Sequence, residues 1–187
     1  MKSFLFSAIS LLVILSACNK DDTPQPEEQE LITTLLMKLT DTAGTATTFT
    51  YKVENGFGST LPGTVQIDTV TLVSGRSYRA ELAVLNEKAS PAEDLTPEII
   101  SESDDHLFFL TISPSSGAGG LLTIIDMSTD NQNRLFAQKF GMVAGAAGSG
   151  SLTITLLHEP TNKSAGTVAG AGGETDLEAT FPVRITP

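Results

Sequence analysis

The chain of 187 residues contains no tryptophan, one cysteine and two histidines. A single cysteine excludes an intramolecular disulfide framework and any zinc site built from several cysteines. Basic residues are also scarce, with 11 Lys and Arg against 22 Asp and Glu and a formal charge of −11. Proteins that bind nucleic acid need a basic surface to displace counterions, so we expect no nucleic-acid partner. What the chain does have is 40% hydrophobic residues, enough for a packed core.

Residues 1–17 are typical of a lipoprotein signal peptide. Lys2 gives a positive start, and residues 4–15 form an apolar run that is too short for a membrane span of about 20 residues. The run ends in Leu15-Ser16-Ala17-Cys18, which resembles the bacterial lipobox. In that signal the leader is cleaved before the cysteine and the thiol carries a diacylglycerol. We therefore predict lipidation at Cys18 and a membrane partner reached through this anchor; the alternative is a buried free cysteine.

Residues 18–29 predict a disordered acidic tether, because they combine prolines with polar and acidic residues. Within the tether, Lys20, Asp21 and Asp22 resemble the lipoprotein export signal of Bacteroidetes, which sends lipoproteins to the outer face of the outer membrane. The resemblance implies a protein anchored in the outer membrane and exposed on the cell surface, with the periplasmic face as the alternative. The other interpretation of these three residues is an ordinary acidic linker.

Residues 30–187 predict one all-β domain. Strands are expected where β-branched and aromatic residues alternate with polar ones between turn signals. The predicted strands are 31–40, 47–53, 65–73, 77–85, 106–113, 121–127, 134–143, 151–158 and 176–185. One short helical turn is expected at 96–103, with Thr96 as the N-cap and Pro97 at the first helical position. This pattern is typical of an Ig-like antiparallel β-sandwich of about eight strands.

Finer features of the domain can also be predicted. Stretches rich in Gly, Ala and Ser predict flexible loops at 115–120, 144–150 and 165–173. Pro182 predicts an edge strand or a strand end, because proline cannot donate a ladder hydrogen bond. The apolar run 107–110 predicts that Phe108 and Phe109 are both mostly buried, one between the sheets and one beneath the 96–103 turn or a long loop.

Several short motifs in the domain resemble an uncharacterised family of small Bacteroidetes surface-type lipoproteins. These motifs are Glu30-Leu31-Ile32-Thr33-Thr34-Leu35, Leu85-Asn86-Glu87, Glu93-Asp94-Leu95-Thr96-Pro97-Glu98-Ile99, Asp105-His106-Leu107-Phe108-Phe109 and Gly172-Gly173-Glu174-Thr175-Asp176-Leu177. The resemblance covers roughly residues 18 to 187. It implies a lipid-anchored surface protein and carries no established activity.

His106 and His158 are the only candidates for a histidine base. Asp104 and Asp105 flank His106, but neighbours along an extended strand face opposite sides, which does not build a catalytic triad. His106 is expected at a strand start, partly exposed or capping a turn. We therefore identify no catalytic residue.

Metal ligands are equally hard to assign from the sequence. The two histidines could bind a metal together with Glu159, Asp104 or Glu174, yet nothing in the spacing places these residues side by side. Residues 126–133 gather oxygen ligands at alternating positions but lack the glycine and terminal Glu of an EF-hand. They predict an Asx-type polar turn, with a weak Ca²⁺ loop as the alternative. No metal ligand and no cofactor is assigned.

The sequence thus predicts a lipid-anchored cell-envelope protein that is not an enzyme: a structural, binding or adhesion module for an unknown protein or glycan ligand. The alternative is a small hydrolase or an ion-dependent carbohydrate-binding subunit at the cell surface. Paired carboxylates are plentiful enough for such chemistry. However, the absence of Trp and the few Tyr leave little aromatic surface for stacking on sugars.

Overall fold

The computed structural model describes residues 30–114 and 120–187. The predicted signal peptide, Cys18 and the residues Lys20, Asp21 and Asp22 lie outside the described residues, as does most of the predicted loop 115–120. Within the described part, no helix has both the length and the apolar character needed to cross a bilayer.

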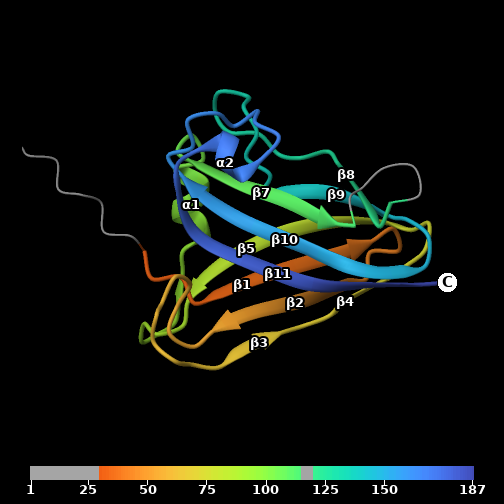
Figure 1. Cartoon of the computed structure of the whole chain (residues 1–187), viewed down its shortest axis with the longest axis horizontal. Coiled ribbons are helices and arrows are strands. Elements are labelled where there is room, and N and C mark those ends of the chain that lie inside the picture. The colour runs from red at the N-terminus through yellow and green to blue at the C-terminus, as the bar shows by residue number, and fades with distance from the viewer. Residues whose placement is uncertain (1–29, 115–119) are drawn as a thin grey trace, which may run out of the picture.

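The described residues form two β-sheets that pack face to face (Figure 1). The larger sheet has the order β3-β2-β1-β5-β9-β8, with β6 paired to β5. Its strands are β1 (Thr34–Asp41), β2 (Ala46–Val53), β3 (Val65–Ile67), β5 (Ser77–Asn86), β6 (Glu93–Asp94), β8 (Leu122–Ile125) and β9 (Lys139–Ala144). The smaller sheet has the order β4-β11-β10-β7. Its strands are β4 (Val70–Val73), β7 (His106–Ser113), β10 (Gly148–His158) and β11 (Glu174–Thr186). The all-β sandwich prediction is confirmed.

The core lies between the two sheets and follows the alternation of the sequence. In β11 every second residue is buried, namely Leu177, Ala179, Phe181, Val183 and Ile185. They pack against alternating residues of the larger sheet, such as Leu35 and Met37 of β1 and Leu82 of β5, all fully buried. Burial of a large aliphatic or aromatic side chain contributes about 1.5–3 kcal/mol, so this alternation is the main source of stability.

Three strand predictions need correction. The single strand predicted at 65–73 divides into β3 and β4, which belong to different sheets, because the chain crosses between the sheets at residues 68–69. The strand predicted from residue 134 begins only at Lys139. The sandwich is also not wholly antiparallel, since β4 and β11 pair in parallel.

The glycine-rich segments are more ordered than predicted. Much of 144–150 belongs to β9 and β10, and 165–173 contains the short helix α2 (Val168–Ala171). Pro182 lies inside β11, opposite Ser151 of β10, and not in an edge strand. Because β4 begins to pair with β11 only at Val183, one side of the strand is open at Pro182, where a missing N–H is tolerated.

The predicted helical turn is present as α1 (Thr96–Ser101), but Thr96 does not cap it. The Thr96 hydroxyl oxygen instead accepts a hydrogen bond of 2.9 Å from the backbone N–H of Val84 in β5. Ile99 on the inner face of α1 is 1% exposed. These two residues hold α1 against the larger sheet, at the end of the sandwich where β7 begins (Figure 1).

The two phenylalanines of β7 face opposite sides. Phe108 is 1% exposed in the inter-sheet core, where its ring lies 5.8 Å from that of Phe136, as predicted. Phe109 is only half-buried. It packs against a small outer cluster with Leu107 and with Ala165, Val168 and Ala171 of the long connection between β10 and β11, which is the predicted long-loop alternative, and not under the α1 turn.

Candidate metal centre

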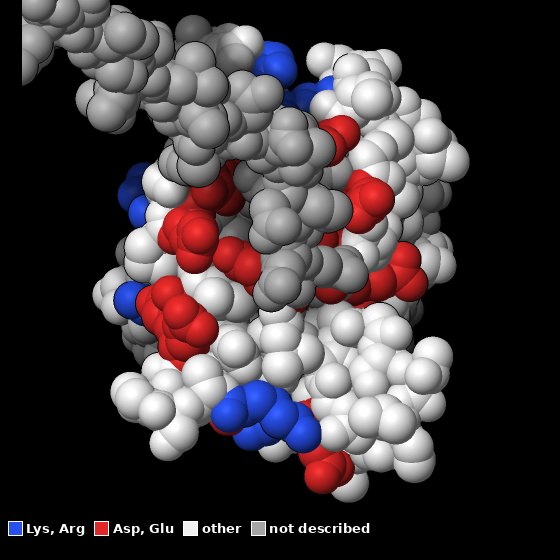
Figure 2. All heavy atoms as spheres, turned by 90° about the vertical axis from the view of Figure 1, so that its left-hand side faces the viewer, with Lys and Arg blue, Asp and Glu red and all other residues white. Residues whose placement is uncertain are grey.

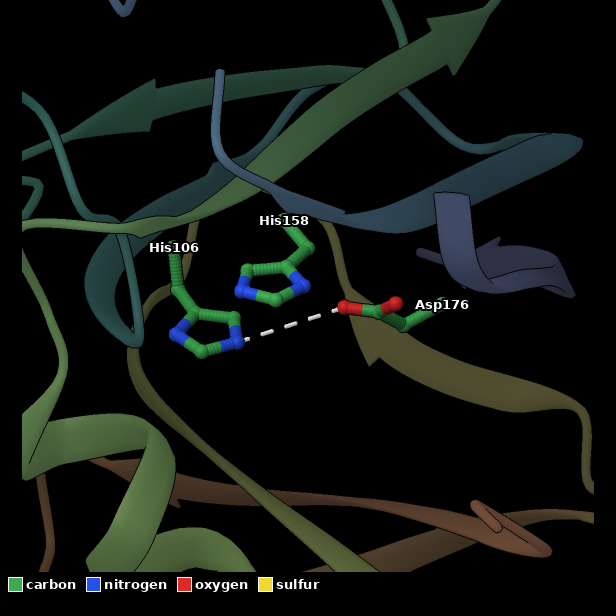
Figure 3. A group of neighbouring side chains, drawn as sticks. All are labelled: His106, His158 and Asp176. Atoms are coloured by element: carbon green, nitrogen blue, oxygen red, sulfur yellow. Dashed lines mark ion pairs between the residues drawn. The ribbon is translucent and has the colours of Figure 1, made fainter. Parts of the chain in front are cut away.

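Three strands of the smaller sheet bring two histidines and an aspartate together. His106 is the first residue of β7, and His158 is the last residue of β10, directly opposite it in the antiparallel ladder. Asp176 lies near the start of β11. One potential ligand atom from each of the three residues lies within 4.8 Å of the others. Figure 3 shows both imidazoles and the carboxylate on the side of the sheet that faces α1.

The histidines share the inner face of the sheet because of strand periodicity. Phe108 in β7 and Leu156 in β10 are both buried in the inter-sheet core. His106 and His158 lie two residues along the same strands, so their side chains are on that same face. They therefore lie at one end of the core, where the apolar residues give way to polar ones.

Asp176 reaches this face through a β-bulge. The register of β10 and β11 passes from Leu156 opposite Leu177 to Leu157 opposite Thr175, which leaves Asp176 as an extra residue. In a regular strand Asp176 would face away from the core, because its neighbour Leu177 faces into it. A bulge re-aims one side chain, and Figure 3 shows Asp176 pointing toward the imidazoles.

The surroundings of His106 match those of a metal ligand. Its side chain is 7% exposed, and its Nδ1 lies 3.1 Å from the backbone carbonyl oxygen of Glu102. A carbonyl only accepts, so we assign the ring proton to Nδ1, the arrangement typical of metal-bound histidines. Nε2 then presents its lone pair toward Asp176 Oδ2, 4.0 Å away, a separation longer than a hydrogen bond. This leaves a donor nitrogen and a carboxylate oxygen facing each other, which is an arrangement that a metal ion could share.

The donor atoms are slightly too far apart to hold a metal ion without adjustment. Tetrahedral zinc with bonds of about 2.0–2.1 Å requires donors about 3.3 Å apart. The rings of His106 and His158 are stacked, with centroids 4.9 Å apart and planes 6° from parallel. An imidazole binds a metal in its own ring plane, so one ring must turn to share an ion with the other.

Further carboxylates lie at this end of the molecule. Glu30, the first described residue, shares a hydrogen bond with Glu98 of α1 and lies near the charges of Glu102 and Asp176. Burial, followed by the negative charge of Glu98, raises the pKa of Glu30 to about 7. Figure 2 shows that acidic side chains outnumber basic ones on this end of the molecule. The site therefore lies in a negative potential that attracts cations.

Asp104, Glu159 and Glu174, the acids predicted as possible partners of the histidines, do not join them in the site. Asp104 Oδ2 accepts a hydrogen bond from Gln132, and its Oδ1 lies 3.6 Å from Arg134. Glu159 and Glu174 are exposed at the strand ends. His106 caps the turn before β7 as predicted, through the Glu102 carbonyl, but it is buried and not partly exposed.

The stretch 126–133 forms the predicted Asx-type turn. Asp130 Oδ1 accepts from the backbone N–H groups of Gln132 and Arg134, at 2.9 and 2.7 Å. Asp130 Oδ2 lies 2.9 Å from both Arg134 Nε and Lys163 Nζ. Burial alone would raise the pKa of Asp130, but the hydrogen bonds from Lys163 and the two backbone groups lower it to about 2. The Asp130 carboxylate is therefore already neutralised by Arg134 and Lys163.

Lys163 links Asp130 to the segment before β7, next to the candidate metal site. Its side chain is 2% exposed, and its ammonium donates to the backbone carbonyl of Ser103 as well as to Asp130. Lys163 follows β10 and Ser103 precedes β7. The contact therefore ties together the segments next to His158 and His106.

The comparisons with known proteins do not assign the chain to a family. No family model matches it, and no curated protein and no solved structure matches it either. The interpretation of the site therefore depends on its own geometry.

Proposed function

We propose that this protein is a lipid-anchored, non-enzymatic binding module of the cell envelope whose ligand is a divalent transition-metal ion of the zinc class. The observation that carries the proposal is the convergence of His106, His158 and Asp176, whose potential ligand atoms all lie within 4.8 Å of one another. Two imidazoles and one carboxylate suit zinc and its neighbours among the transition metals. Calcium, in contrast, takes six to eight oxygen ligands.

The burial of the ligands supports binding over catalysis. The side chains of His106 and Asp176 are 7% and 9% exposed. A catalytic metal needs an open coordination position that a substrate can reach. The limited access to His106 and Asp176 favours an ion that stays in place.

The envelope location is proposed from the sequence. Cys18 would carry the lipid, and Lys20, Asp21 and Asp22 would direct the protein to the outer face of the outer membrane. The tether of residues 18–29 ends at Glu30, which lies near Asp176. We propose that the metal-binding end of the sandwich is consequently the end nearest the membrane.

A zinc titration of the purified domain tests the binding function. A site at 100 times its Kd adds about 2.7 kcal/mol to stability, so the Tm should rise by several degrees with Zn²⁺ and not with Ca²⁺. His158→Gln and Asp176→Asn should each weaken zinc binding by more than about 10-fold, because they remove proposed ligands and even loss of an outer partner typically costs that much. Glu178→Gln, on the exposed face of β11, is the matched control and should bind like the parent. Absence of any zinc response in the parent would reject the proposal.

Protease treatment of intact cells tests the proposed location. The parent should be cleaved at the surface of a Bacteroidetes-type host, whereas replacing Lys20, Asp21 and Asp22 together with Ala should protect it. Equal cleavage of both proteins would identify these residues as a plain linker.

A further inference from the structure

The outer face of the larger sheet carries two adjoining hollows over β1, β5 and β9. Their volumes are about 530 and 560 Å³, within the range of sites that bind small molecules. Four residues line both hollows, namely Thr40, Arg79, Asp126 and Gly141. Among the described residues no helix covers this face, because Ile99 of α1 packs in the inter-sheet core and Ala171 of α2 packs on the smaller sheet. Figure 1 shows both helices at the end of the sandwich where β7 begins.

Strand register brings charged side chains together at these hollows. Lys38 of β1 is paired with Glu81 of β5, and Glu81 is paired in turn with Lys139 of β9. The next row on the same face, two residues along each strand, consists of Thr40, Arg79 and Gly141. The neighbours of Lys38 and Glu81 along their strands are buried in the core, so these side chains face outward.

Two of the three cations in these rows have no carboxylate partner. Lys139 Nζ lies 2.9 Å from Glu81 Oε1, which neutralises that pair. Lys38 and Arg79 both line the first hollow, and in the part of the chain that the structure describes neither forms an ion pair. An arginine and a lysine without partners on one hollow can hold an anionic group between them.

Gly141 gives the second hollow an apolar side. A Cβ on this glycine would lie 2.7 Å from Cγ1 of Ile125, so the isoleucine occupies the space that another side chain would take. Ile125 is 40% exposed and lines the same hollow as Arg79. The hollows therefore offer cations, an apolar surface and the hydrogen-bonding groups of Thr40 and Asp126. A sugar ring presents the matching features, since it has hydroxyl groups at its rim and C–H groups on its faces.

The carboxylates in the hollows narrow the choice of anion. Glu81 lines one hollow, Asp41 lines the other and Asp126 lines both. A densely charged polymer, such as a nucleic acid or a sulfated glycan, would be repelled by these acids. A sugar with a single carboxylate can place it on Arg79, whose planar guanidinium matches a carboxylate, and donate its hydroxyl groups to Asp126. Recognition of this kind does not require the aromatic stacking surface that the chain has little of.

We infer that this face binds an acidic glycan built from uronic acid residues, with Arg79 and Lys38 holding a carboxylate and Asp126 accepting hydrogen bonds from hydroxyl groups. The inference goes beyond the proposed metal function and does not depend on it. The three candidate metal ligands belong to the smaller sheet, whereas the hollows lie on the outer face of the larger one.

Calorimetric titration of the purified protein with trigalacturonate tests the inference. EDTA is present throughout, so that no cation bridges the sugar to the protein. The parent should bind trigalacturonate and not the neutral galactose trimer, and added salt should weaken binding. Arg79→Gln should reduce the affinity at least about tenfold, because it removes a charge-assisted bidentate contact. Arg79→Lys should restore only part of the affinity, since lysine lacks the planar fork.

Arg184→Gln is the matched control. Arg184 is exposed on β11 of the smaller sheet, so the same charge is removed from the opposite side of the sandwich and binding should equal that of the parent. Lys38→Gln is a second variant of the first hollow and should also weaken binding. Equal Tm values of the variants would show that each one is folded.

Several outcomes would overturn the inference. These are a parent that does not bind trigalacturonate, a parent that binds the neutral trimer equally well, and equal losses of affinity in Arg79→Gln and Arg184→Gln. Tighter binding of dextran sulfate or polyglutamate than of trigalacturonate would assign the hollows to another class of polyanion. None of these results bears on zinc binding, which is measured without EDTA and with different variants.

Discussion

Gly173 lies so close to His158 that a Cβ on the glycine would be 2.3 Å from the His158 carbonyl oxygen. Gly173 also has a φ of 82°, a left-handed conformation that is costly for other residues. The connection between β10 and β11 therefore depends on this glycine. The same connection positions His158 at the end of β10 and Asp176 near the start of β11.

Replacing Gly173 with Ala should destabilise the fold by more than about 2 kcal/mol, through both the clash and the φ angle. It should also weaken zinc binding. Gly166→Ala is the control, because a Cβ there meets nothing within 4 Å. Urea unfolding measures the difference, and equal stabilities of the two variants would contradict the expected close packing.

The two phenylalanines of β7 should respond differently to truncation. Phe108→Ala removes a ring that is 1% exposed and should cost about 3–5 kcal/mol. Phe109→Ala removes a half-buried ring and should cost clearly less. Chemical denaturation of both variants checks this order. The reverse order would mean that Phe109, and not Phe108, faces the inter-sheet core.

Lys163→Met should destabilise the domain by about 3–5 kcal/mol, because it leaves the buried Asp130 carboxylate and the Ser103 carbonyl without their ammonium partner. Lys139→Met provides the comparison. Its ion pair with Glu81 is exposed, so its loss should change the free energy of unfolding by less than about 0.5 kcal/mol. Thermal or urea unfolding that ranks the two variants equally would exclude this linking role of Lys163.

Asp130 should give the domain an acid-dependent stability. Its pKa is about 2 in the folded protein against 3.8 for the ordinary carboxyl, so the folded state favours the ionised form. The resulting stability is complete above about pH 4 and is lost as the pH falls through 2. The free-energy difference between the parent and Asp130→Asn should therefore be largest at neutral pH and shrink in acid. A difference that stays constant from pH 7 to 2 would assign the effect to packing alone.

Cys18→Ser should abolish lipidation, because serine lacks the thiol that accepts the diacylglycerol. Metabolic labelling with a fatty acid should mark the parent and not the variant. Label retained by the serine variant would place the lipid elsewhere or exclude the lipobox.

The sequence predicts the sandwich well where one face of a strand is buried. Alternation in β11 identified each residue that faces the core, from Leu177 to Ile185. It failed at 65–73, since residues 65–67 and 70–73 have the same local pattern but pair with different sheets. Pairing partners are set by tertiary packing, and local strand propensity does not encode them.

The candidate metal centre could be predicted only in part from the sequence. Both histidines stood out as the only two in the chain, but the acid that joins them did not. Alternation places Asp176 on the face opposite Leu177, and only the bulge reverses this. A bulge depends on the register of the partner strand, so the signal that selects Asp176 over Glu159 or Glu174 exists only in three dimensions.

The position of β11 has a consequence for how the chain reaches its native state. This strand lies between β10 and β4, and the Thr186 hydroxyl donates to Leu72, which is 114 residues away along the chain. Until β11 docks, β4 has no partner in the smaller sheet, and the part of the larger sheet that β11 covers remains open. Folding governed by such distant pairings is slow. Because Asp176 belongs to β11, the three candidate ligands come together only when this strand is in place, so binding at the proposed metal site would report that β11 has docked.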